Sequence, residues 1–403
     1  MLKVYSDVLK LPGAWKFSLA GFITRFPMSM VNISIILLIS TLYKSYSIAG
    51  QVAAVTTVAY AIFVPWLSRL VDRYGQRKVM LPAILISSLN LLLLAFSAMF
   101  LLSPWVLNLF SAIAGASSGS IGALIRSRWA KTVQNPKQLH TAYALESAVD
   151  EVVYVIGPII ATVLTTSVYP PAGLVVAVFF NITGGIWLFS QKSTEPKLVK
   201  LEKGVKQKSL LRIKAISALA IIYLCAGTMF GLCDVVVVAF AEELGAKSYS
   251  GIVLAIFACG SMLGALIYGA RHWAQPIWKL LIVGIVLLGF GVSTFIFADN
   301  LIILSFAMFI TGFTIAPTMT NVNNMVERVV PKNRLTEGFS WMSTSINIGV
   351  SSGAFAGGYL VDFGGSDLGF IATVIFAWIM VVIGFLVLPI LRKASENHTL
   401  SND

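Results

Sequence analysis

The chain alternates long apolar runs with short polar segments. Twelve runs are long enough to cross a bilayer, since about 20 apolar residues span its hydrocarbon core as a helix. The third run, for example, contains LLLLAFSAMFLL in a nearly charge-free stretch from Leu81 to Leu102. Helices are expected because a helix satisfies its own backbone hydrogen bonds in lipid. The predicted spans are 14–43, 47–68, 79–102, 104–127, 140–168, 172–191, 214–243, 249–270, 277–297, 301–326, 335–362 and 369–391.

The composition also indicates a membrane protein. Hydrophobic residues make up 57% of the 403 residues and charged residues only 11%, whereas soluble chains carry about 25% charged residues. The mean hydropathy is +0.86. The sequence therefore predicts an all-α membrane protein with twelve transmembrane helices. A cleaved signal peptide is not expected, because the first apolar run is too long and no short apolar core leads to a small-residue cleavage site.

The net charge of +12 can be interpreted once each basic residue is assigned to one side of the membrane from the predicted spans. If the amino terminus is cytoplasmic, every Lys and Arg except Lys44, Lys247 and Arg25 falls on the cytoplasmic side. This asymmetry is the positive-inside signature of orientation, so it gives no reason to expect a nucleic-acid partner. We therefore expect a multi-pass protein of the cell inner membrane, surrounded by membrane lipids, with both termini in the cytoplasm.

The longest polar stretch, residues 192–213, divides the chain into two halves, 1–191 and 214–403. It is either a solvated cytoplasmic linker or a segment lying on the anionic inner leaflet, since it mixes basic and aliphatic residues. The halves are weakly similar: NPKQLHTAYAL before the fifth span matches VPKNRLTEGFS before the eleventh, aligning Pro136 with Pro331. Internal repeats of six spans are typical of transporters built as two bundles around a central site.

The loop after the second span carries a more specific pattern, SRLVDRYGQRK. It resembles the loop signature of the major facilitator superfamily between the second and third helices, although Ser68 replaces the usual first glycine. The matching residues are Leu70, Asp72, Arg73, Gly75, Arg77 and Lys78. The resemblance implies two six-helix bundles whose first, fourth, seventh and tenth helices line a central cavity. It also implies a secondary transporter that moves a small-molecule solute by alternating access and works as a monomer.

The fifth span contains YVIGPIIATVL, which resembles part of a second superfamily signature associated with antiporters. Gly157 and Pro158 match that pattern, but Ala161 and Thr162 lie near the place of its following glycine pair. The resemblance favours proton-coupled efflux. A proton symporter or a uniporter for solute uptake remains the alternative, because the antiporter pattern is incomplete.

Arg25 lies about ten residues into the first predicted span, and three acids, Glu146, Asp150 and Glu151, lie in the fifth. A charge at the bilayer centre costs about 2.5–3.5 kcal/mol, so it requires a partner. Arg25 and Asp150 lie about equally deep, and the superfamily fold implies that these helices are neighbours, so we expect Arg25 to pair with one of the acids. Crowded carboxylates make a proton-coupling site one interpretation. A static ion-pair network that holds two helices together is the other.

Polar residues in the four helices that the resemblance assigns to the cavity are candidates for solute binding. Small residues at helical spacing would equally indicate close helix packing, but buried amides and carboxylates are costly without a polar partner. The predicted substrate-cavity residues are Arg25, Asn32, Asp234, Asn321, Asn323 and Asn324.

The loop signature also suggests a conformational gate. Asp72 is placed to approach the positive amino-terminal end of the eleventh helix near Thr336, which would favour the state closed to the cytoplasm. Arg126, Glu327 and Glu337 are predicted at the same surface as inter-bundle ion pairs. Alternatively, the basic residues of the loop only set the topology. The complete predicted gate is Asp72, Arg73, Gly75, Arg77, Lys78, Arg126, Gly157, Pro158, Glu327 and Glu337.

Other function classes are less consistent with the sequence. The three histidines lie at span ends or in the tail, and the three cysteines lie within spans. This distribution predicts no metal site, no cofactor other than the coupling proton, and no disulfide framework. An enzyme is therefore not expected. A transport-inactive receptor built on the same fold remains open; it would bind solute without moving it.

Overall fold

The computed structural model describes residues 2–196, 209–246, 249–271 and 273–397, which form helices joined by short loops. Most of the predicted linker, residues 197–208, lies outside the described residues, as do Lys247, His272 and His398. The helices are α1 Leu2–Leu9, α2 Ala14–Tyr43, α3 Tyr46–Tyr74, α4 Gln76–Met99, α5 Pro104–Ser118, α6 Ile121–Thr132, α7 Pro136–Val163, α8 Ala172–Ser190, α9 Lys214–Glu243, α10 Ser250–Ala270, α11 Ile277–Ser293, α12 Leu301–Val329 and α13 Leu335–Asn397.

The predicted twelve spans are confirmed with two differences in how the helices are divided. The fourth span is made of α5 and α6, which are separated at Gly119, where the backbone has a left-handed φ of 69°. The last two spans are joined in α13, which is 63 residues long and has non-helical backbone at Gly364 and Gly365. At about 1.5 Å per residue, α13 is long enough to cross a bilayer twice.

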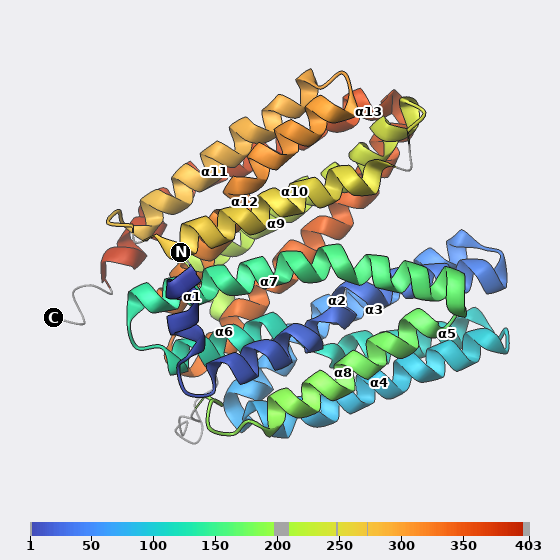
Figure 1. The fold of residues 1–403 in the computed structure, drawn as a ribbon, viewed down its shortest axis with the longest axis horizontal. Coiled ribbons are helices and arrows are strands. Elements are labelled where there is room, and N and C mark those ends of the chain that lie inside the picture. The colour runs from blue at the N-terminus through green and yellow to red at the C-terminus, as the bar shows by residue number, and fades with distance from the viewer. Residues whose placement is uncertain (1, 197–208, 247–248, 272, 398–403) are drawn as a thin grey trace.

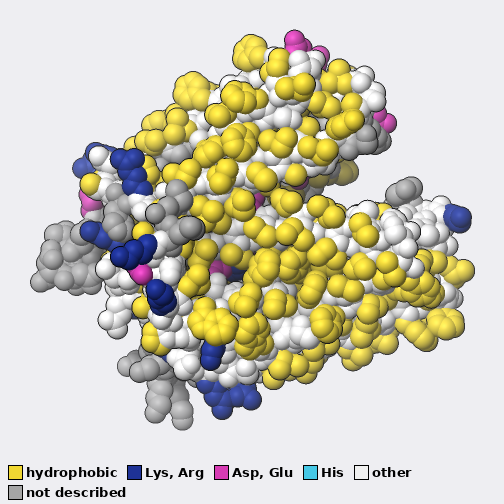
Figure 2. Space-filling view, in the orientation of Figure 1, with side chains coloured by type: hydrophobic (Ala, Val, Ile, Leu, Met, Phe, Trp, Pro, Cys, Tyr) yellow, Lys and Arg dark blue, Asp and Glu magenta, His cyan; other side chains and the backbone are white. Residues whose placement is uncertain are grey.

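The helices form two bundles (Figure 1). We call α2–α8 the first half and α9–α13 the second half. The halves meet at the end of the molecule that holds α1 and the last turns of α13, and they separate toward the opposite end, where the space-filling view is hollowed between them (Figure 1 and Figure 2). We call these the terminal end and the open end. Lysine and arginine side chains gather at the terminal end (Figure 2).

Glycines allow close packing within each half. In the second half, a Cβ atom at Gly353 of α13 would collide with the Thr228 backbone of α9, and one at Gly231 of α9 would collide with the Val350 backbone of α13. Small residues at such contacts let helix backbones approach closely in membranes. Gly349 and Gly353 of α13 therefore allow close packing between two helices of the same half.

The outer surface of the bundles is apolar. Large side chains such as Phe297 and Phe355 are more than 80% exposed, and hydrophobic atoms cover most of the middle of the visible face (Figure 2). Such a surface is stable only against lipid, because a contiguous apolar area of this extent would drive aggregation in water.

Candidate functional site

A buried ion-pair network joins α2 to α7. The Arg25 guanidinium Nη1 lies 2.6 Å from Glu146 Oε2 and 3.3 Å from Asp150 Oδ1. The side chains of Arg25 and Glu146 are completely buried. The other Glu146 oxygen accepts hydrogen bonds from Trp129 Nε1 at 2.6 Å and from Ser18 Oγ at 3.1 Å. The predicted pairing of Arg25 with the fifth-span acids is present, whereas its role in coupling stays a prediction.

Arg126 of α6 completes this network. The structure therefore corrects the prediction that Arg126 forms an ion pair between the bundles at the gate. Its Nη2 donates to Asp150 Oδ2 at 2.8 Å, within the first half. Gly122 makes room for this arrangement, because a Cβ atom there would lie 2.8 Å from Arg126 Nη1. The network thus holds two guanidinium groups and two carboxylates, and its formal charges balance.

Glu151 stands apart from this network. Its Oε1 accepts a hydrogen bond of 2.6 Å from Ser261 Oγ of α10, so its side chain contacts the second half. Helical geometry predicts this divergence, since consecutive residues point about 100° apart. Glu151 is the fifth-span acid that meets a neutral donor across the interface, while Glu146 and Asp150 meet cations.

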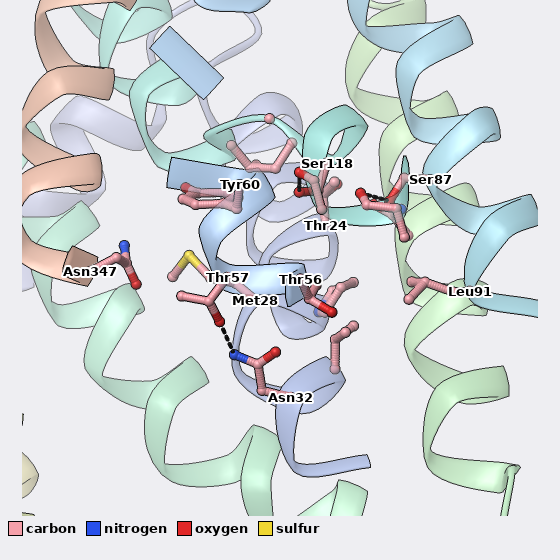
Figure 3. Close-up of a pocket in the computed structure, with 17 residues that line it drawn as sticks. Thr24, Met28, Asn32, Thr56, Thr57, Tyr60, Ser87, Leu91, Ser118 and Asn347 are labelled. Atoms are coloured by element: carbon pink, nitrogen blue, oxygen red, sulfur yellow. Dashed lines mark hydrogen bonds between the residues drawn. The ribbon is translucent and has the colours of Figure 1, made fainter. Parts of the chain in front are cut away.

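A pocket with apolar and polar lining residues lies on the first half, and Asn347 of α13 also lines it (Figure 3). Its volume is about 110 Å³. Asn32 lines it, and its Nδ2 donates to Thr57 Oγ1 at 3.1 Å. Arg25, also predicted to contact solute, is fully buried and is not among the lining residues. Asn32 is thus the predicted cavity residue that the pocket contains.

The other predicted cavity residues lie elsewhere. Asn321 and Asn324 of α12 are buried near the terminal end: Asn321 Oδ1 accepts from the Tyr268 hydroxyl at 2.8 Å, and Asn324 Nδ2 lies 3.0 Å from His140 Nδ1. Asn323 is buried beside them, and Asp234 is exposed on α9. The asparagines therefore face protein side chains in this conformation.

The contacts predicted for the conformational gate centre on Glu337 at the start of α13. Asp72 Oδ2 accepts a hydrogen bond of 2.9 Å from the Glu337 backbone N–H, as the predicted approach to this helix end requires. The Glu337 carboxylate is 1% exposed and pairs with Arg69 Nε of α3 at 2.7 Å and with Arg334 Nη2 at 2.6 Å. Beside it, Ser68 and Ser340 hydroxyls lie 2.5 Å apart across the halves.

The remaining predicted gate residues are distributed over several places. Arg73 lies over the ring of Tyr74, and Lys78 is exposed. Gly75 ends α3 with a φ of 98°, and the Arg77 backbone N–H donates to Glu195 at 3.0 Å. Glu327 lines a cavity of about 160 Å³ next to Asp72.

Gly157 and Pro158 lie within α7, away from the terminal end. The Gly157 position is in contact with Ser29 of α2, whose hydroxyl donates to the Val153 carbonyl at 3.0 Å. In this structure Gly157 therefore allows α7 to pack closely against α2 within the first half.

Several contacts between the halves involve residues that sequence reasoning missed. Arg69 lies near the end of α3, within the signature sequence, and pairs with Glu337 of the other half. Tyr5 of α1 donates to the Leu266 carbonyl of α10 at 2.7 Å, and no charge or motif marks it in the sequence. Thr141, which lies within the repeat segment NPKQLHTAYAL, donates to the Gly269 carbonyl at 2.7 Å.

Comparisons with known proteins agree with this architecture. A family model described as Major Facilitator Superfamily matches residues 17–270 and 219–403. The human organic anion transporter MFSD10 (TETRAN) superposes with a TM-score of 0.74 at 12% identity, covering 93% of this chain and 99% of that one. A bacterial homologue of the iron transporter ferroportin in the outward-facing state gives 0.71 at 13% identity, covering 94% and 98%. At such identities the likeness concerns the fold alone.

Two proteins are similar in sequence over part of their length. The class B tetracycline resistance protein of Escherichia coli is 28% identical over 202 residues, which are 48% of each chain. The multidrug resistance protein MdtG of Enterobacter lignolyticus (strain SCF1) is 36% identical over 74 residues, which are 18% of this chain and 17% of that one. The chain thus aligns with about half, or less, of the length of these relatives.

Proposed function

Since the chain belongs to the major facilitator superfamily of membrane transporters, we propose that it exports a small organic solute across the inner membrane in exchange for protons. The observation that carries this proposal is the arrangement of acids on α7. Glu146 and Asp150 are neutralised by Arg25 and Arg126, while Glu151 faces a neutral serine hydroxyl of the other half. The resistance functions named for the two sequence relatives support the direction of transport.

The conformation fits one step of alternating access. With both termini in the cytoplasm, as the charge distribution favours, the terminal end is the cytoplasmic side and the separated end faces outward. The Glu337 cluster and the α7–α10 contacts then hold the cytoplasmic side closed. In this state a solute leaves to the outside and a proton enters.

Glu151 is our candidate for the proton carrier. A hydrogen bond to a charged acceptor contributes about 1.5–3 kcal/mol, and one to a neutral acceptor about 0.5–1.5 kcal/mol. Protonation of Glu151 therefore weakens the link to Ser261 by about 1 kcal/mol, which shifts the balance toward separation of the halves about fivefold. A proton that enters from outside thus favours the conformation that is open to the cytoplasm. Exchange requires proton binding to shift the conformational equilibrium in this direction.

The test is solute-dependent proton movement in liposomes that contain the purified protein and a pH-sensitive dye. Tetracycline and a panel of lipophilic amines serve as solutes. We expect solute gradients to drive proton flux in wild type and in Glu396→Gln, a control at an exposed carboxylate. Glu151→Gln should lose the proton flux yet retain exchange of labelled solute for unlabelled solute.

The possible outcomes separate the alternatives. Proton flux in the same direction as the solute would identify a symporter, and solute movement without proton flux in any variant would identify a uniporter. Solute binding without movement would identify a receptor. Retention of full proton coupling in Glu151→Gln would reject Glu151 as the carrier.

A further inference from the structure

The pocket beside Asn32 provides hydrogen-bond acceptors in an otherwise mostly apolar wall. Met28 and Leu91 contribute apolar surface, and Tyr60 contributes an aromatic ring (Figure 3). Its lining includes no Asp, Glu, Lys or Arg. What the pocket can recognise therefore depends on which polar atoms of its amides and hydroxyls remain unused.

The Asn32 amide has a fixed orientation. Thr57 Oγ1 donates its single hydrogen to the Ala53 carbonyl at 3.1 Å, so the same oxygen must accept from Asn32. The Asn32 atom at 3.1 Å from it is therefore the amide nitrogen, a conclusion that rests on the bonding network. The carbonyl oxygen Oδ1 points away from Thr57 (Figure 3).

The Asn347 amide is fixed by the same argument. Its Nδ2 donates to the Ser343 backbone carbonyl at 2.7 Å, and a carbonyl can only accept. Asn347 Oδ1 is therefore left for another donor. Asn32 belongs to the first half and Asn347 to the second, so the two unused acceptors come from opposite halves.

Three hydroxyls of the pocket already donate to backbone carbonyls. Thr24 donates to Ala20 at 2.6 Å, Ser87 to Ala114 at 3.0 Å and Ser118 to Gly115 at 2.9 Å. The Arg25 guanidinium is buried outside the lining and paired with acids. Each amide nitrogen keeps one further hydrogen, but among the described residues that line the pocket there is no cation to balance an anionic group.

We propose that the pocket binds a non-anionic amphiphile through its hydrogen-bond donors, amine or hydroxyl, which are accepted by Asn32 Oδ1 and Asn347 Oδ1. This inference rests on the proposed function and defines the class of its solute. The volume of about 110 Å³ is below the 300–1,000 Å³ of pockets that enclose drug-sized ligands. The pocket therefore holds the donor-bearing end of a larger solute, and the rest lies in the cleft.

Binding to purified protein in detergent tests this inference without relying on transport. The probes are three molecules of one shape: 1-naphthylmethylamine, 1-naphthalenemethanol and 1-naphthoate, followed by quenching of tryptophan fluorescence. We expect the amine and the alcohol to bind at least about 10-fold more tightly than the carboxylate. Asn32→Leu and Asn347→Leu should each weaken binding of the two donor probes about 3- to 10-fold, as loss of a hydrogen bond predicts.

Asn90→Leu is the matched control, because this amide donates to the Ile86 carbonyl of its own helix and lies outside the pocket. Asn32→Asp adds a positive result: it should strengthen binding of the amine and leave the alcohol nearly unchanged. Naphthoate binding as tight as the amine would overturn the proposal. Unchanged affinity in folded Asn32→Leu and Asn347→Leu would also overturn it.

These outcomes are independent of the proton-exchange test. Selective binding of the donor probes, without solute-driven proton flux, would reject proton-coupled exchange and support the proposed recognition of hydrogen-bond donors in the pocket. Proton-coupled transport by a protein that binds naphthoate equally well would support exchange and reject the pocket.

Discussion

Substitution of Glu146 by Gln tests how much the buried network contributes to the stability of the first half. The substitution removes the charge 2.6 Å from Arg25 Nη1. The remaining acid, Asp150, lies farther away at 3.3 Å and already pairs with Arg126. Loss of one partner from a buried ion pair costs about 3–5 kcal/mol. The new amide can still accept from Trp129 and Ser18, so we expect a loss near the lower limit, about 3 kcal/mol.

The assay is thermal unfolding in detergent, followed by tryptophan fluorescence. The matched control is Glu396→Gln, the same chemical change at an ion pair whose side chains are 54% and 60% exposed. Exposed pairs contribute about 0–1 kcal/mol, so this variant should melt close to wild type. The double variant Arg25→Gln/Glu146→Gln should recover part of the loss, because the unpaired cation is gone. Equal melting of Glu146→Gln and Glu396→Gln would refute the reasoning.

Three further predictions concern contacts around the network and between the halves. Asp72→Asn weakens the hydrogen bond to the Glu337 N–H by about 1–2 kcal/mol. Spin labels at positions 78 and 332 should therefore show a larger population in which the two halves are separated at the terminal end, and Arg73→Gln is the control. Tyr5→Phe removes the bond from α1 to α10, worth about 1 kcal/mol, and should increase hydrogen exchange of α1 without loss of global stability. Gly157→Ala, which collides with Ser29, should lower the melting temperature, whereas Gly50→Ala, which meets open space, should not.

Sequence reasoning located Arg25 and its partners because depth in the membrane can be counted from span ends. It misplaced Arg126, and the reason is local. The break at Gly119 separates α5 from α6, so the face of a residue after it cannot be counted from the residues before it. Gly122 then provides the space in which Arg126 approaches Asp150. Neither effect follows from hydrophobic periodicity.

The asparagines of α12 illustrate a different limit. Their helix and their polar face follow from the sequence, and the resemblance assigns that helix to the cavity. Whether such a face meets solute or protein depends on which end of the molecule is closed. In this conformation Asn321 and Asn324 bond Tyr268 and His140. One sequence encodes both conformations, so the pattern of polar residues does not distinguish the contacts made in one conformation from those made in the other.

The placement of charged and neutral contacts follows a physical rule that suits two moving halves. Opening a buried ion pair costs about 3–5 kcal/mol, and the chain keeps Arg25 and Arg126 paired within one half, where the pairs move as one body. Contacts across the halves near α10 use neutral donors, such as Ser261 and Thr141, at about 1 kcal/mol each.

The pair of Arg69 with Glu337 is a charged contact across the interface, and its position makes it compatible with this rule. Arg69 is 22% exposed at the terminal end, so water can reach its guanidinium as the halves separate, and its desolvation cost is correspondingly small. Glu337 keeps Arg334 of its own half as a partner after separation. Removal of Arg334 should therefore make opening more costly, because Glu337 would then lose its last cation. Arg334→Gln should lower the population of the separated state in the same spin-label measurement in which Asp72→Asn raises it, and an increase would contradict this account.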